Sequence, residues 1–207
     1  MAKKAVKFDV HPGVKMVQEW VASLRSKTGR TLEEWVAVTV KDGPADESGR
    51  RAWLKEKHGL GTNTAWWLAE RAMGKPNDEE NPEVYLAAAD RYMEGQYSGK
   101  KAALRPIFDA LYTRARALGK DVRICPCKTM VPLYRNHVFG QIKATTNTRI
   151  DLGLALAKHT GKLPARLIDT GGAAKKDRIT HRIAIQAPGE VDDTVLKWLA
   201  RAYALDA

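Results

Sequence analysis

The sequence predicts an α+β protein in two parts. A small all-α domain of about four short helices is followed by an α+β domain with an antiparallel sheet of about four strands and flanking helices. Three observations lead to this prediction. Apolar residues recur at helical spacing as far as about residue 118, and they alternate with polar residues from Asp121 onward. The helical region is divided by KPNDEENP, residues 75–82, which is polar, acidic and proline-containing.

The first helix is expected over residues 12–26. Val14, Val17 and Val21 share one helical face there, and Pro12 suits a helix start. A capping box, in which two side chains satisfy the first free N–H groups, then opens the second helix in TLEE, residues 31–34, and this helix runs to about residue 40.

Two further helices complete the all-α domain. Ser48 is expected to cap a helix that ends at His58, and GLG follows as a break. Thr62 is expected to cap the fourth helix, which ends before Gly74. This pair resembles a helix-turn-helix in outline, but the region is electrically neutral, so we interpret it as an ordinary helical hairpin.

The acidic segment gives the domain boundaries. We expect a helical domain at 10–75, a linker and connecting helix at 76–95, and a basic α+β domain at 96–207. The last of these begins with a long helical pattern in which Pro106 marks a start or a kink, and it ends with an amphipathic helix preceded by Asp192. Between these helices four strands are expected, at residues 122–134, 137–145, 148–154 and 179–185. Arg135-Asn136 is expected to form the turn between the first two strands.

The net charge of +11 is concentrated in one region. Residues 1–95 are neutral, whereas residues 96–182 hold 18 Lys and Arg against 5 Asp and Glu. A block of this density favours an anionic partner, either nucleic acid or another polyanion. The basic loop TGGAAKKDR, residues 170–178, lacks the spacing of a phosphate-binding P-loop, although it could touch a phosphate backbone.

Other classes of protein are disfavoured by composition. Apolar runs are far too short for a membrane span, and the first residues show no secretory signal, so we expect a cytoplasmic protein without a membrane partner. Cys125 and Cys127 are the only cysteines, and their C-x-C spacing is weak evidence for a metal or redox site. The sequence predicts no catalytic residue, no metal and no cofactor.

Strand alternation predicts a basic sheet face with aromatic residues among the cations. Such a face suits phosphate contacts and base stacking with single-stranded nucleic acid. Its expected members, together with the turn residue Arg135, are Lys128, Tyr134, Phe139, Lys143, Arg149 and Arg182.

Two alternatives remain open. A small-ligand site or enzyme could use Asp151 and His181 with Arg149, although alternation places His181 on the opposite face. A metal-dependent nuclease is disfavoured because Asp121 and Gln141-Ile142-Lys143 lack a second carboxylate. A protein-interaction module could instead use Trp66 or Trp67, which cannot both face inward on one helix.

The assembled segments resemble two families. TGRTLEEWVAV and RRAWLKEKHGLG look like the helical domain of unknown function 4287. GKKAALRPIFDAL, KTMVPLYRN, FGQIKATTNTRIDLGLAL and ITHRIAI look like the domain of unknown function 5655. The resemblance covers about residues 10–75 and 95–205 and implies an arrangement of domains without a reaction. Relatives of the second domain resemble modules found beside nuclease-like domains, which favours a nucleic-acid partner by association.

Overall fold

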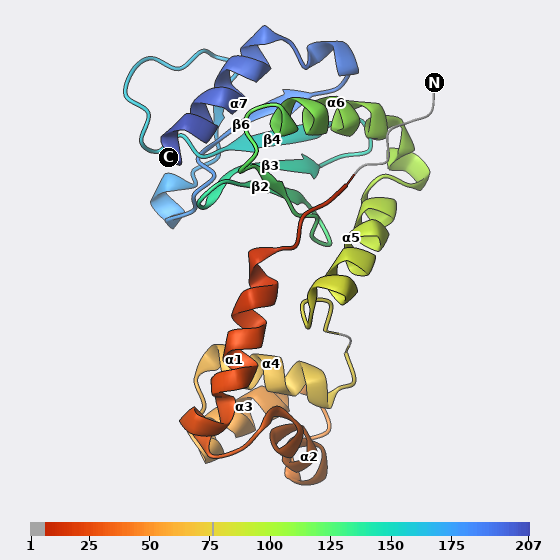
Figure 1. Cartoon of the computed structure of the whole chain (residues 1–207), viewed down its shortest axis with the longest axis vertical. Helices are drawn as coiled ribbons and strands as arrows, with labels where there is room; N and C mark the ends of the chain where they lie inside the picture. The colour runs from red at the N-terminus through yellow and green to blue at the C-terminus, as the bar shows by residue number, and fades with distance from the viewer. Residues whose placement is uncertain (1–6, 76) are drawn as a thin grey trace. The chain divides into compact units, whose positions relative to one another are not determined.

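A computed structural model describes residues 7–75 and 77–207 (Figure 1). These residues form two compact units. The helical unit is Pro12–Tyr85, and the sheet unit is Leu86–Ala207 together with the chain up to His11. The helix α5 (Pro82–Gln96) contains the point of division, which lies inside the segment assigned above to a linker and connecting helix.

The helical unit contains the four helices that the sequence predicts. They are α1 (Pro12–Thr28), α2 (Leu32–Asp42), α3 (Glu47–His58) and α4 (Thr62–Ala72). The capping box of α2 is present, with Thr31 and Glu34 each bonded to the other's backbone. The predicted caps Ser48 and Thr62 are wrong by one or two residues. Asp46 caps α3, since its carboxylate accepts the amide hydrogen of Gly49, and α4 follows Gly61 without a side-chain cap.

In its described residues, the sheet unit combines three α-helical segments and three short 3-10 helices with six strands in the order β1-β2-β3-β4-β6-β5. Neighbouring strands are all antiparallel. After α5 come the short 3-10 helix η1 (Gly99–Leu104), α6 (Arg105–Arg116), β1 (Arg123–Ile124), β2 (Val131–Tyr134), β3 (Val138–Ala144), β4 (Ile150–Leu154), β5 (Ile168–Asp169), η2 (Ala173–Lys175), β6 (His181–Ile185), η3 (Pro188–Glu190) and α7 (Asp193–Leu205). Pro106 lies in the first turn of α6, where its missing N–H costs nothing, so the helix starts there without a kink.

Helices α6 and α7 cover one face of the sheet (Figure 1). Phe108 and Leu111 of α6, and Leu199 of α7, pack in one buried cluster with Ile142 and Leu152 of the central strands. The opposite face carries the polar positions of β3, β4 and β6. This division into a covered face and a polar face decides which charged side chains meet.

The predicted single strand over residues 122–134 is wrong. β1 ends at Ile124, and the chain turns back so that the amide of Cys127 donates to the carbonyl of Met130. Pro126 has no N–H to give to a ladder, which favours this interruption. Pro126 is a local signal of this break, but the alternating pattern runs on through the turn and predicts one continuous strand. The predicted turn at Arg135-Asn136 is present between β2 and β3.

Residues near the N-terminus of the described chain protect the edge of β1. The amide of Asp9 donates to the carbonyl of Ile124 at 3.0 Å, and the amide of Ile124 donates to the Asp9 carboxylate at 2.7 Å. Arg116 forms an ion pair with the same carboxylate, and the Tyr112 hydroxyl donates to the carbonyl of Lys7 at 2.7 Å. This segment therefore occupies hydrogen-bonding groups that an edge strand would otherwise expose.

Candidate anion-binding site

The polar face of the sheet brings three of the predicted cations together. Lys143 of β3 lies directly opposite Asp151 of β4 in the strand register, and Arg182 of β6 lies opposite Gly153 of the same strand. Directly opposed residues share one face, and diagonal neighbours are within reach of long side chains. Arg149, just before β4, also reaches Asp151. We call Lys143, Arg149, Asp151 and Arg182 the Asp151 cluster.

Asp151 holds two guanidinium groups in place. Its Oδ1 lies 3.0 Å from Arg149 Nε and 3.1 Å from Arg182 Nη1, and Arg149 Nη2 donates to Oδ2 at 3.3 Å. The carboxylate side chain is only 12% exposed, whereas the two arginine side chains keep 29% and 28% exposure. One carboxylate against three cations leaves the cluster with a net positive charge of two. Its arginines are oriented and still reachable from solvent.

The prediction that Phe139 lies on the exposed basic face is wrong. Tyr134 pairs with Val138 and Leu133 pairs with Gly140, so Phe139 is an extra residue in the ladder. Such a bulge redirects side chains, and Phe139 is fully buried in the core, 5.5 Å from the ring of Tyr203. Strict alternation could not reveal this inserted residue.

Tyr134 is half-buried, and its hydroxyl and ring contact other side chains of the protein. His11 Nε2 lies 2.9 Å from its hydroxyl, and the Arg123 guanidinium lies 5.8 Å from its ring centroid. Burial, followed by the charge of Arg123, lowers the pKa of His11. The two aromatic residues predicted to stack on bases are therefore engaged in packing.

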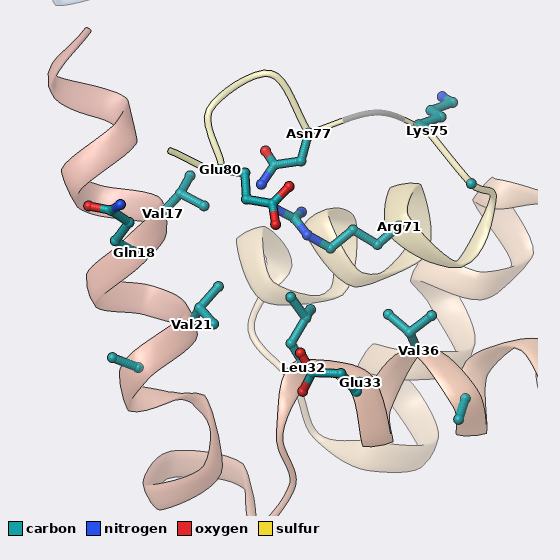
Figure 2. A pocket seen from close by; sticks show the side chains of 13 residues that line it. Val17, Gln18, Val21, Leu32, Glu33, Val36, Arg71, Lys75, Asn77 and Glu80 are labelled. Atoms are coloured by element: carbon teal, nitrogen blue, oxygen red, sulfur yellow. The ribbon is translucent and has the colours of Figure 1, made fainter. Parts of the chain in front are cut away.

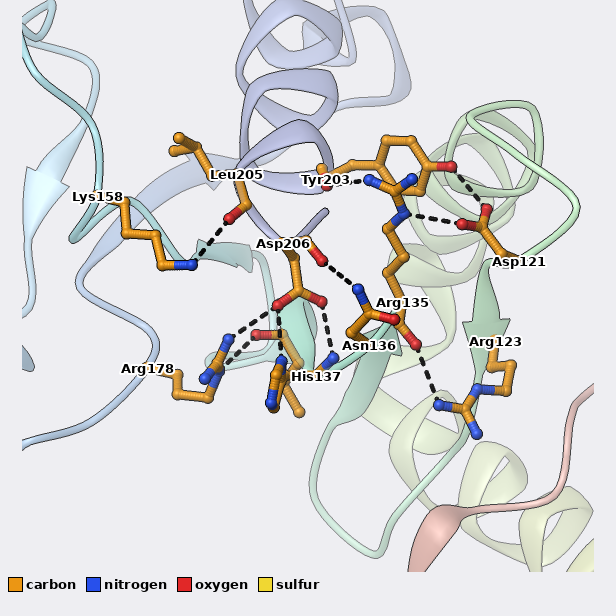
Figure 3. Close-up of polar contacts among 11 residues, drawn as sticks. Asp121, Arg123, Arg135, Asn136, His137, Lys158, Arg178, Tyr203, Leu205 and Asp206 are labelled. Carbon is orange, nitrogen blue, oxygen red and sulfur yellow. Dashed lines mark hydrogen bonds and ion pairs between the residues drawn. The ribbon is translucent and has the colours of Figure 1, made fainter.

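Arg135 and Lys128 do not belong to the Asp151 cluster. Arg135 lies in the turn between β2 and β3, and Lys128 lies in the turn between β1 and β2. Arg135 donates to the Asp121 carboxylate at 2.8 Å and its guanidinium lies 4.4 Å from the ring centroid of Tyr203 (Figure 3). Tyr203 also donates to Asp121 at 2.6 Å, and these two bonds hold the pKa of Asp121 below its ordinary value. This network fastens the β2–β3 turn to α7. Lys128 is exposed in the turn between β1 and β2.

The alternative ligand site does not form. His181 lies opposite Leu154 in the register, on the face that carries Ile183, and its Nδ1 is 3.0 Å from Thr180 Oγ1. It therefore points away from the face that carries Asp151. No group of three His, Cys, Asp or Glu side chains suited to a metal ion occurs among residues 7–75 and 77–207.

The cysteines of the β1–β2 turn differ in environment. Cys125 is fully buried with its thiol 3.7 Å from the carbonyl of Val10, and burial raises its pKa to about 12. Such a thiol stays protonated and acts as a small apolar side chain. Cys127 is partly exposed.

Asp206 organises a second polar region, which the sequence analysis missed (Figure 3). This buried carboxylate accepts the amide of His137 at 2.7 Å, its Nδ1–H at 3.1 Å, and Arg178 Nη2 at 2.9 Å. Beside it lies a cavity of about 300 Å³ with Lys158, Lys176 and Arg178 in its lining. The basic loop of residues 170–178 was the only sequence signal for it, because the other walls come from residues 155–158, which follow β4, and from the C-terminal end of α7 with Asp206.

The helical unit contains a larger groove, of about 870 Å³, between α1 and α2 (Figure 2). Its sides are apolar, with Val17 and Val21 from α1 and Leu32 and Val36 from α2, and Arg71 and Glu80 point toward one another at its end. Elsewhere in this unit Trp66 is 39% exposed, whereas the ring of Trp67 packs 4.8 Å from that of Trp20. None of the helices in the described residues is long and apolar enough to cross a membrane.

Comparison with known families agrees with the resemblance seen in the sequence. Residues 93–206, more than half of the chain, match the family described as Domain of unknown function (DUF5655). Residues 16–72 match Domain of unknown function (DUF4287). No curated protein and no solved structure matches the chain.

Proposed function

We propose that this chain, which belongs to the DUF5655 family, binds nucleic acid or another polyanion through the polar face of its sheet. The observation that carries the proposal is the Asp151 cluster, in which one buried carboxylate orients two arginines beside Lys143. Guanidinium groups held in this way lose little conformational freedom when they contact a phosphate.

The distribution of ion pairs in the sheet unit supports an anionic partner. Among the described residues, the ion pairs of the basic block 96–182 are made by arginines and, with Asp206, by His137, and none of the lysines of the block lies within 4.0 Å of a carboxylate. Unpaired lysines are strongly hydrated point charges that release counterions when they meet phosphates. The basic block therefore carries arginines that carboxylates hold in place, together with lysines whose positive charge is not neutralised by an ion pair.

The mode of binding follows from the engaged aromatic rings. Phe139 is buried and the ring of Tyr134 is flanked by His11 and Arg123, so neither side chain offers a free stacking platform. Contacts to the phosphate backbone carry little sequence information. We therefore expect sequence-tolerant binding in which duplex and single-stranded oligonucleotides compete for the same face.

The test is a fluorescence anisotropy titration of labelled duplex and single-stranded oligonucleotides at two salt concentrations. Three phosphate contacts on duplex give a slope of log affinity against log salt of about −2.7, hence a loss of roughly 40-fold between about 50 and about 200 mM salt. Lys143→Ala is expected to reduce this loss to roughly 12-fold, because one contact is gone.

Lys27→Ala is the matched control, since it removes an exposed lysine from α1 in the other unit. Affinity that is insensitive to salt would contradict the proposal. Equal losses in Lys143→Ala and Lys27→Ala would contradict the assignment to this face.

A second candidate function, protein binding by the helical unit, is favoured by the α1–α2 groove. Of the four charged residues in its lining, Lys75 is paired with Glu47 and Arg71 points toward Glu80, so the carboxylate of Glu33 is the charge that faces no cation of the lining. An apolar groove with a carboxylate on its α2 side fits an amphipathic helix that carries a basic residue beside its apolar face. Binding of a synthetic peptide of this type should be lost in Val36→Lys, which places a cation in the groove, and kept in Val40→Lys, at an exposed α2 position outside it. Unchanged affinity in Val36→Lys would refute this candidate.

A further inference from the structure

The cavity beside Asp206 combines an apolar wall with a cationic edge. Ala155 follows β4, Ala173 belongs to η2 and Ala202 belongs to α7, so three separate segments contribute small side chains to the wall. Lys158, Lys176 and Arg178 supply the positive charge. All of these residues belong to the sheet unit.

The two carboxylates in the lining are engaged inside the protein. Asp206 accepts three hydrogen bonds, from the amide and ring of His137 and from Arg178. Asp177 Oδ1 accepts the amide hydrogen of Ile179 at 3.0 Å. Their negative charge therefore serves to fix Arg178 and the loop, and Arg178 is fixed further by the carbonyl of Val138 at 3.3 Å.

The lysines of the cavity have weak partners or none. The ammonium of Lys158 donates to the carbonyl of Leu205 at the long distance of 3.5 Å. Within the described ranges 7–75 and 77–207, the Lys176 ammonium makes neither a hydrogen bond nor an ion pair. Two cations at one cavity without a carboxylate partner create a field that favours an anion.

Among the described residues, Lys176 is the only non-glycine residue whose backbone φ is positive, at +57°. An L side chain in this left-handed conformation costs free energy, and glycine adopts it freely. Lysine at this position is therefore poorly explained by the local fold, and residues held in such conformations are found more often at ligand sites.

We propose that this cavity binds a small phosphate monoester of the nucleoside monophosphate class. Lys158 and Lys176 would contact the phosphate oxygens, with Arg178 held at their side by Asp206, and the alanine wall would pack against the organic body. A volume of about 300 Å³ lies at the small end of ligand pockets, which fits a mononucleotide better than a dinucleotide cofactor. The inference does not rest on the proposed function of the sheet face, because it uses different residues.

Isothermal titration calorimetry with adenosine 5′-monophosphate tests the proposal, with inorganic phosphate and adenosine as separate probes. We expect the monophosphate to bind, inorganic phosphate to bind more weakly, and adenosine to show no binding. Lys176→Gly should weaken binding of the monophosphate by about tenfold through loss of a charged contact. The same variant should unfold at an equal or higher temperature, because glycine relieves the left-handed backbone.

Lys175→Ala is the matched control. Lys175 is a neighbouring lysine that is also exposed but does not line the cavity, so its loss should leave the affinity unchanged. Lys176→Arg, which keeps the charge, should bind within a few-fold of the native chain. The proposal is overturned if the native chain does not bind the monophosphate, if Lys176→Gly binds it as tightly as the native chain, or if Lys175→Ala weakens binding equally. Binding of adenosine alone would also overturn it.

Discussion

Asp151→Asn separates the two roles of the Asp151 cluster, because stability and affinity should change in opposite directions. The substitution keeps the shape of the side chain and removes its charge, so Arg149 and Arg182 face each other without the carboxylate between them. Both arginine side chains are less than one-third exposed, so their ion pairs are screened less than surface pairs. Charged hydrogen bonds of this kind contribute about 1.5–3 kcal/mol. We expect the free energy of unfolding to fall by about 2 kcal/mol, which lowers Tm by roughly 6–10 °C.

Polyanion affinity should rise in the same variant. Removing one negative charge about 6 Å from a bound phosphate in a water-like medium contributes about 0.7 kcal/mol, or roughly a threefold gain at low salt. Urea denaturation followed by tryptophan fluorescence measures the stability, and anisotropy with a labelled duplex measures the affinity. Unchanged stability would refute the view that Asp151 holds the arginines. Weaker binding would show that the positions of the arginines matter more than the net charge of the cluster.

Two further predictions concern buried titratable groups near β1. Burial lowers the pKa of His11 below 6.5 in the folded chain. As pH falls below 6.5, the unfolded chain therefore binds a proton that the folded chain does not yet bind. The free energy of unfolding accordingly decreases until the pH has passed through the lowered pKa of the folded chain. Denaturation between about pH 7.5 and about pH 5.5 should therefore show a smaller loss in His11→Gln than in the native chain, and equal losses would contradict this assignment. In Cys127→Ser the remaining thiol, Cys125, should react with dithiobis-nitrobenzoate only after unfolding, since it is fully buried with a pKa of about 12; rapid reaction in native buffer would contradict its burial.

The sequence predicted the helices well because their signals are local. The capping box at Thr31, the GLG break after His58 and Pro106 at the start of α6 each depend on residues within one helical turn. The strands were predicted less accurately. β5 has two exposed residues and no alternation, and it exists only because β6 is available as a partner, which a local pattern does not encode.

The candidate site shows the same division between local and distant information. Alternation placed Lys143, Arg149 and Arg182 on one face, and the register of β3, β4 and β6 brings them to Asp151. Phe139 was misplaced because a bulge adds one residue to the ladder, and strict alternation does not allow for an added residue. The cavity beside Asp206 could not be predicted, since its walls come from three segments spread over about 50 residues of the chain, at 155–158, 173–178 and 202–206.

The pairing of Asp9 with Ile124 has a consequence for the entropy of the chain. The sheet unit fixes both His11 and Leu86, so the helical unit, residues 12–85, is a loop whose two ends are tethered to one folded body. A tethered loop has fewer conformations when unfolded than a free chain of equal length. While the sheet unit is intact, the helical unit therefore unfolds into a restricted ensemble, and this restriction through chain connectivity stabilises its folded state.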